Sequence, residues 1–321
     1  MIKNVFVLAA LFFAGVSGFA QTGGSAPLHV TPAHAWRNPD QSMLLDVERA
    51  GSRIVAVGEH GIVLLSDDGG TTFRQARVVP ASGTLSAVHF VDAQHGWAVG
   101  QSGVILMSDD GGETWALQRS DTSVDQPLYS VYFKDARHGW VVGLWSLMLS
   151  TSDGGETWNK IMLPAPPGGG KADLNLYKIF ANHEGHIFVA AEQGTVIRSR
   201  NNGVSWEYRE TGNKGSFWAG TVADDDSIYV GGLLGHLYRS TDDGESWARV
   251  ESGSSGSITE LVSVGTEVVG VGLDGFVITG NADSGHFTAY QRRDRAALTG
   301  VMVAGKAAAI LLSKDGIVKA E

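Results

Sequence analysis

The sequence predicts an all-β protein, a seven-bladed β-propeller of four-stranded blades. Three observations predict this fold. An eight-residue polar pattern that ends in an aromatic residue occurs five times, and short apolar stretches surround each copy in the same order. No stretch shows the sustained 3.6-residue periodicity of an amphipathic helix. Units of about 42 residues with four short strands each are typical of propeller blades.

The recurring pattern is Ser/Thr, any residue, Asp, any residue, Gly, any residue, Thr/Ser and Trp/Phe. Successive terminal aromatic residues are separated by 42, 43, 48 and 41 positions. The residues that define the five copies are Ser66, Asp68, Gly70, Phe73; Ser108, Asp110, Gly112, Trp115; Thr151, Asp153, Gly155, Trp158; Ser199, Asn201, Gly203, Trp206; and Ser240, Asp242, Gly244, Trp247. We expect each copy to join the third strand of a blade to the fourth.

The second unit shows the order of elements most clearly. Strands are expected at 85–90, 97–100 and 104–107, followed by the polar pattern and a fourth strand at 115–119. The same order places the seven blades at about 44–79, 85–120, 128–163, 176–211, 217–252, 258–293 and 298–321. The last unit has only three strands. We therefore expect residues 28–36 to supply its fourth strand, closing the ring by pairing the two ends of the chain and removing an exposed sheet edge.

Residues 1–20 read as a secretory signal peptide, which leaves 21–321 as one domain. Lys3 gives a positive start, residues 5–13 are apolar, and small residues precede Gln21. The alternative is an uncleaved membrane anchor, but the apolar run is short for a membrane span. We expect an exported protein in the periplasm, with secretion as the second location, and no membrane span once the signal is removed.

The composition of the chain disfavours two classes of binding partner. The chain has no cysteine and a formal net charge of −10. An acidic surface disfavours nucleic acid and anionic membranes, which both require clustered lysine and arginine. We expect a monomer that binds no nucleic acid, with no cofactor and no metal.

The polar pattern itself is interpreted as structural. Its glycine suits a positive φ, its Ser and Asp side chains can accept hydrogen bonds from turn amides, and its aromatic residue can pack into the blade. A calcium loop is the functional alternative, but no bidentate glutamate closes the pattern.

The pattern matches the Asp-box, or bacterial neuraminidase repeat. The wider unit runs from His95-Gly96-Trp97-Ala98-Val99-Gly100 through Gly103 to Asp110-Gly111-Gly112-Glu113-Thr114-Trp115. It resembles the Ycf48/Hcf136 family of photosystem II assembly factors and their relatives in non-photosynthetic bacteria, most strongly in the first three blades. The resemblance implies a non-enzymatic assembly or stability factor for a membrane protein complex, which is photosystem II in a photosynthetic host and a transport protein elsewhere. Photosynthetic members dock their partner with an arginine patch, and this acidic chain has no comparable run of arginines.

A secreted carbohydrate-binding or glycoside hydrolase-type propeller is the alternative function. Sialidases share the Asp-box, but no arginine stands at the start of the inner strands here. Another glycosidase would need two suitably spaced carboxylates. Candidates on the face opposite the boxes are Glu59, Glu192, Asp274 and Asp315.

That same face carries the candidate partner-binding residues. Turn tips are normally polar, yet two turns between second and third strands carry large apolar side chains, and two aromatic residues begin the inner strand of the fifth blade. The candidates are Leu144, Trp145, Phe217, Trp218, Leu233 and Leu234. The alternative is that they pack under the long link at 164–175, which is itself a lid, a partner arm or slack.

Overall fold

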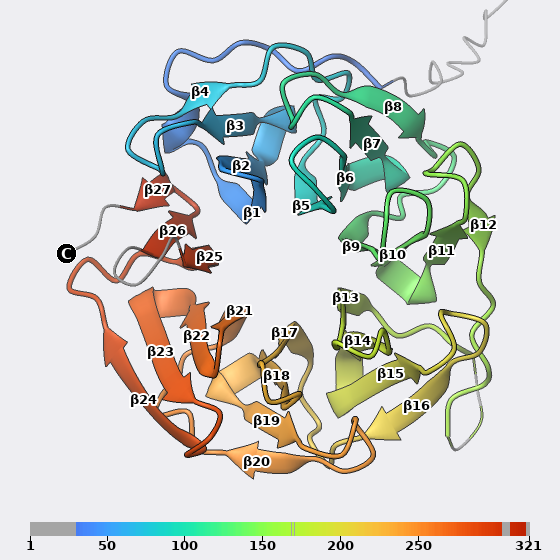
Figure 1. The fold of residues 1–321 in the computed structure, drawn as a ribbon, viewed down its shortest axis with the longest axis vertical. Helices are drawn as coiled ribbons and strands as arrows, with labels where there is room; N and C mark the ends of the chain where they lie inside the picture. The colour runs from blue at the N-terminus through green and yellow to red at the C-terminus, as the bar shows by residue number, and fades with distance from the viewer. Residues whose placement is uncertain (1–29, 168, 170, 304–308, 319–321) are drawn as a thin grey trace, which may run out of the picture.

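The computed structural model describes residues 30–167, 169, 171–303 and 309–318. The predicted signal peptide at 1–20 and Leu28 and His29 of the expected closing strand lie outside these residues. The chain forms seven antiparallel sheets arranged in a ring (Figure 1), which confirms the predicted seven-bladed β-propeller. None of the described residues forms a helix long and apolar enough to cross a membrane.

Strand order within each blade follows the chain from the ring centre outward. The innermost strands are β1 (Leu44–Ala50), β5 (Leu85–Phe90), β9 (Leu128–Phe133), β13 (Leu176–Ala181), β17 (Phe217–Val222), β21 (Ile258–Val264) and β25 (Leu298–Val303). The second strands are β2 (Arg53–Gly58), β6 (Gly96–Gly100), β10 (Gly139–Gly143), β14 (Ile187–Ala191), β18 (Ile228–Gly232), β22 (Glu267–Gly272) and β26 (Ala309–Ser313). The third strands are β3 (Val63–Ser66), β7 (Ile105–Ser108), β11 (Met148–Thr151), β15 (Thr195–Ser199), β19 (Leu237–Ser240), β23 (Phe276–Asn281) and β27 (Gly316–Val318).

The outermost strands are short. They are β4 (Arg74–Gln75), β8 (Ala116–Arg119), β12 (Asn159–Lys160), β16 (Glu207–Glu210), β20 (Ala248–Val250) and β24 (His286–Gln291). One-turn 3₁₀ helices join second strands to third strands in six blades. They are η2 (Glu59–Gly61), η3 (Gln101–Gly103), η4 (Leu144–Ser146), η5 (Glu192–Gly194), η6 (Leu233–Gly235) and η7 (Leu273–Gly275).

The core consists of apolar layers between neighbouring blades. Along β2, Val55 and Val57 pack toward the second blade, whereas Ile54 and Ala56 pack toward the seventh. This two-sided burial explains why the strands are apolar on both faces, since each sheet is covered by a blade on either side. The ring therefore positions seven innermost strands around one central channel.

Each innermost strand begins with a β-bulge. The strand register skips the second residue in all seven blades; the skipped residues are Leu45, Ser86, Tyr129, Tyr177, Trp218, Thr259 and Thr299. The opposing residue is usually glycine. At Gly143, for example, a Cβ atom would lie 2.2 Å from the carbonyl oxygen of Pro127. A bulge re-aims a side chain, so this fold gives each blade one specially placed residue at the start of its inner strand.

The ring closes differently from the sequence prediction. Residues 30–36 form no strand with the last blade; the Ala33 amide donates to the Val79 carbonyl oxygen at 2.9 Å, and Trp36 and His34 bond to Gln75 of β4. Among the described residues the seventh sheet has three strands, and η1 (Pro39–Gln41) lies beside β27.

Closure instead uses side-chain packing between the first and seventh blades. Leu44 and Ile54 of the first blade pack with Met302, Ile310 and Leu312 of the seventh. The Thr299 hydroxyl also donates to the Leu44 carbonyl oxygen at 2.5 Å. An apolar layer like those between the other blades therefore joins the two ends of the chain.

Candidate functional site

The Asp-boxes are self-contained turns. In the second blade the Asp110 carboxylate accepts hydrogen bonds from the Ser108 hydroxyl, the Thr114 amide and the Thr114 hydroxyl at 2.9, 2.8 and 2.6 Å. Gly112 has a φ of 85°, and its amide donates to the Ser108 hydroxyl. Trp115 is buried in the layer between the first and second blades. The defining side chains Ser108, Asp110 and Thr114 are thus all bonded to one another or to amides of the same turn.

Equivalent bonds recur in the other four copies, with Asn201 in place of aspartate in the fourth blade. Hydrogen bonds from Thr72 and Ser66 lower the pKa of Asp68 to about 2, and those from Ser246 and Ser240 do the same for Asp242. These carboxylates stay ionised as acceptors for turn amides. The arrangement stabilises the turn.

The opposite face, here called the turn face, carries η2–η7 and the links between blades. Each of these turns is tied to the link before its blade; the Leu144 amide, for example, donates to the Pro127 carbonyl oxygen at 3.1 Å. The middle residue of each turn has a left-handed backbone, as at His60, Ser102, Trp145, Gln193, Leu234 and Asp274. Glycine, asparagine and aspartate adopt this conformation most readily.

Trp145 and Leu234 are therefore doubly unusual. Their φ angles are 52° and 58°, and their side chains are 58% and 68% exposed. Both the left-handed backbone and the exposure to water are unfavourable for a large apolar side chain. Strain of this kind, about 1 kcal/mol or more per residue, is often found at functional positions.

The structure distinguishes among the six predicted partner-binding residues. Leu144, Trp218 and Leu233 are half-buried on the turn face. Phe217 is completely buried in the layer between the fourth and fifth blades, so its assignment to a contact surface is wrong. It is the first residue of an inner strand, where every blade places a core side chain.

The long link at 164–175 does not cover Trp145. It is fixed to the turn below, because the Ser146 amide donates to the Leu174 carbonyl oxygen at 2.7 Å and the Trp145 amide donates to Asn175 Oδ1 at 3.1 Å. The Trp145 side chain nevertheless remains more than half exposed. Burial under the link is thus excluded for this residue.

Hydrogen bonds connect the turn face of the third blade to that of the fifth. Asn175 donates to Glu192 Oε1 at 2.8 Å, and the Tyr177 hydroxyl donates to the same oxygen at 3.3 Å. Ser216 lies beside the Tyr177 hydroxyl, and its carbonyl oxygen accepts from the Leu233 amide at 3.2 Å. Trp145 and Leu234 are therefore two ends of one continuous, braced surface.

The four carboxylates considered for glycoside hydrolysis all have local partners. Glu59 accepts from the Met43 amide, Glu192 from Asn175 and Tyr177, and Asp315 from Lys314. Asp274 pairs with Arg295, which lowers its pKa. They stand on the turns of different blades, and each has partners of its own.

A cavity of about 460 Å³ occupies the central channel. The innermost strands face it with one edge that has no neighbouring strand, and side chains from adjacent blades satisfy part of that edge. Asp46 and Glu48 accept from the amides of Val88 and Phe90, both at 2.9 Å. Ser130 accepts from the Ile179 amide at 3.2 Å. Polar residues in the channel thus replace missing strand partners.

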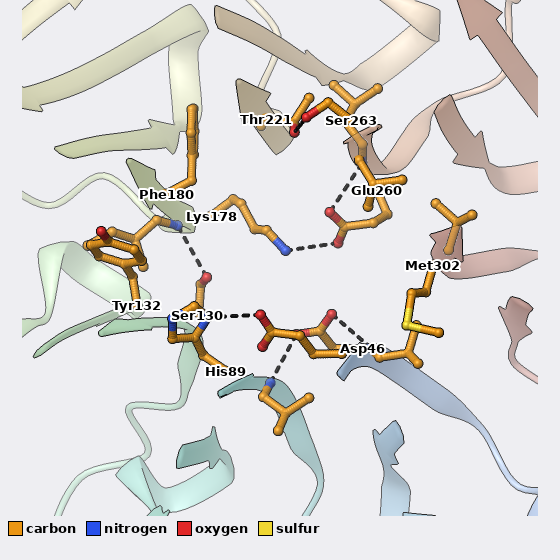
Figure 2. A pocket seen from close by; sticks show the side chains of 18 of the residues that line it. Asp46, His89, Ser130, Tyr132, Lys178, Phe180, Thr221, Glu260, Ser263 and Met302 are labelled. Atoms are coloured by element: carbon orange, nitrogen blue, oxygen red, sulfur yellow. Dashed lines mark hydrogen bonds and ion pairs between the residues drawn. The ribbon is translucent and has the colours of Figure 1, made fainter. Parts of the chain in front are cut away.

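Charged side chains meet inside this channel (Figure 2). Lys178 extends across it to Glu260, with Nζ 3.1 Å from Oε2, and His89 pairs with Glu48 at 3.1 Å. Burial raises the pKa of Asp46 to about 6; the Lys178 charge opposes this effect, and the Glu260 and Glu48 charges add to it. Burial alone would lower the pKa of Lys178, but Glu260 and Asp46 outweigh it and raise that pKa.

Sequence reasoning missed this channel network. A signal was present, because Asp46, Lys178 and Glu260 are charged residues that all stand third in their inner strands. Aligning the seven inner strands would have placed them in one layer. Among the described residues no group of three or more histidine, aspartate or glutamate side chains could hold a metal ion.

Together the ring, the five Asp-boxes and the braced apolar turn face define a seven-bladed Asp-box propeller with a candidate protein-docking face. The family model of the photosynthesis system II assembly factor YCF48 matches residues 77–217. The chain is Ycf48-like over this stretch, which confirms the resemblance found in the sequence. No curated protein sequence matches the chain.

Solved structures agree on the fold. A structure titled "YCF48 bound to D1 peptide" superposes with a TM-score of 0.68 at 17% identity, covering 89% of this chain and 97% of that one. YCF48 from Cyanidioschyzon merolae superposes with a TM-score of 0.68 at 16% identity, covering 87% and 95%. At these identities the likeness establishes the common propeller fold.

Proposed function

We propose that this protein is a non-enzymatic, exported scaffold or assembly factor that docks a membrane protein, or its complex, on the turn face. The observation that carries the proposal is the pair of exposed apolar side chains, Trp145 and Leu234, held at strained turn positions on one braced surface. Exposed apolar groups on a rigid support are the usual anchors of protein interfaces.

The Ycf48-like stretch supports the kind of partner. It spans the second to fourth blades and includes Trp145, and one structure of the same fold carries a D1 peptide. In a photosynthetic host the partner is photosystem II; in another host it is a membrane transport protein. The apolar N-terminal run supports export to the periplasm, and the protein acts there as a monomer.

Site-specific crosslinking in the native host tests the proposal. A photo-crosslinking amino acid is placed at Trp145, at Leu234 and, as a control, at Asp109 in an Asp-box on the opposite face. We expect a discrete membrane-protein adduct from the first two positions and none from Asp109. Adducts from Asp109 alone, or from no position, contradict docking on the turn face, and recovery of the protein only from the cytoplasm contradicts export.

A further inference from the structure

The bulged positions show where the turn face differs between blades. In the third, fourth and fifth blades they are aromatic, as Tyr129, Tyr177 and Trp218, whereas the other four are Leu45, Ser86, Thr259 and Thr299. All three aromatic side chains are half-buried. We call Tyr129, Trp145, Tyr177, Trp218 and Leu234 the aromatic arc.

Contacts hold the middle of the arc in place. The rings of Tyr129 and Tyr177 stack with their centroids 5.6 Å apart and their planes inclined by 17°. The Tyr177 hydroxyl is bonded to Glu192, and Glu192 is bonded to Asn175, which accepts from the Trp145 amide. The tyrosine pair is therefore held in place by contacts that lead to the backbone amide of Trp145.

Two carboxylates lie near this pair. The carboxylates of Glu192 and Asp125 both act on Tyr129, where they add to burial and to Tyr177 in raising its pKa. Among the residues that the structure describes, neither carboxylate forms an ion pair with a lysine or arginine. Aromatic faces attract cations, and nearby carboxylates strengthen that attraction.

We propose that the aromatic arc docks a protein segment that presents an arginine or lysine between apolar side chains. The cation lies against the tyrosine pair and faces Asp125 and Glu192, while Trp145 and Leu234 contact the apolar side chains on either side. This inference rests on the proposed docking function and specifies the chemistry of the partner.

Peptide retention tests the inference. Three pools of capped pentapeptides have arginine, citrulline or glutamate at the centre and mixed Leu, Phe and Val at the other positions. Citrulline keeps the shape of arginine without its charge. We expect the immobilised protein to retain the arginine pool about fivefold more than the citrulline pool, and the glutamate pool least.

Variants distinguish binding of the cation by the aromatic arc from non-specific attraction of cations to an acidic protein. Tyr129→Leu should abolish the preference for arginine, whereas Tyr129→Phe, which keeps the aromatic face, should preserve it. Asp125→Asn should weaken the preference, and Asp109→Asn, which removes one charge on the box face, should not. Equal retention of the arginine and citrulline pools overturns the inference, as does an arginine preference that survives Tyr129→Leu.

The outcome is distinguishable from failure of the docking function itself. If all pools lose retention equally with Trp145→Asn but arginine and citrulline pools bind alike, the face docks apolar segments and the cation is wrong. If Trp145→Asn changes no pool and crosslinking from Trp145 fails, the docking function is wrong.

Discussion

At Trp145 and Leu234, the proposed docking function and the stability of the fold favour different side chains. Each has a left-handed backbone in a turn whose equivalents carry histidine, serine, glutamine or aspartate. Nothing in the fold requires an apolar side chain there, because both side chains are mainly exposed. Their cost is local strain, and the proposed docking function accounts for their exposure.

Replacement by asparagine should therefore separate the two effects. Trp145→Asn and Leu234→Asn should each leave the free energy of unfolding unchanged or raise it by up to about 1 kcal/mol, because asparagine tolerates this backbone. The same variants should lose partner binding. Urea unfolding measures the first effect, and retention of the partner measures the second.

Ser102→Asn supplies the matched control. Ser102 occupies the equivalent turn of the second blade with a φ of 57°. The same backbone gain is expected there with no loss of binding. A clear fall in stability for Trp145→Asn would show that the tryptophan supports the fold.

At the scale of elements, the innermost strands matter most for stability, because each has one edge that faces the central channel. Their channel-facing edges have no strand partner, and acidic side chains accept their amide hydrogens. Placing carboxylates in a narrow channel raises their pKa values unless a cation balances them. Lys178 balances Glu260 at 3.1 Å, and Asp46 is left with a pKa of about 6.

This imbalance predicts a pH dependence. The folded protein holds a proton on Asp46 between about pH 4 and 6 that the unfolded chain releases, so this contribution to stability falls as pH rises through that window. Asp46→Asn lacks the penalty of ionisation. The stability of the variant relative to the natural protein should therefore rise by about 1–3 kcal/mol between pH 4 and pH 7.

Urea unfolding at pH values across this range measures the difference. Asp109→Asn, at an exposed box position, is the control for the loss of one carboxylate from the surface. Asp46 also helps to raise the pKa values of His89 and Lys178, so the comparison is repeated in a His89→Gln background to separate the titration of Asp46 from that of His89. A constant difference between Asp46→Asn and the natural protein would show that Asp46 titrates normally in the fold.

At the scale of the whole molecule, the ring depends on contacts between its first and seventh blades, which are far apart in the chain. Leu44 and Thr299 lie 255 residues apart and are joined by a hydrogen bond, and the surrounding layer is apolar. Since no described strand from the N-terminal segment pairs with β27, this layer carries the closure.

Leu312→Ala should weaken closure selectively. The side chain is fully buried between the first and seventh blades, and its truncation should cost about 3 kcal/mol. Hydrogen exchange should accelerate first in the first and seventh blades. The comparable substitution Ile197→Ala, in the layer between the third and fourth blades, should accelerate exchange there. Uniform acceleration by both variants would contradict local opening at the seam.

The sequence was sufficient to predict the blade count and the box face, because Gly, Asp and the terminal aromatic have fixed roles in a local turn. It also predicted that Trp145 and Leu234 stand on turns. It could not reveal closure, because packing of Leu312 on Ile54 depends on contacts across the whole chain. Nor could it separate buried Phe217 from half-buried Trp218, since a bulge between adjacent residues decides which way each one points.

The repeated bulge has a consequence for divergence among propellers of this kind. The seven bulged positions surround one end of the central channel. Their side chains are not part of the apolar layers between blades. Exchanging the residues at these positions would move the recognition surface around the rim while leaving the boxes and the apolar layers intact. On the proposed docking function, a few substitutions at the bulged positions would therefore be enough to change which partner this fold binds.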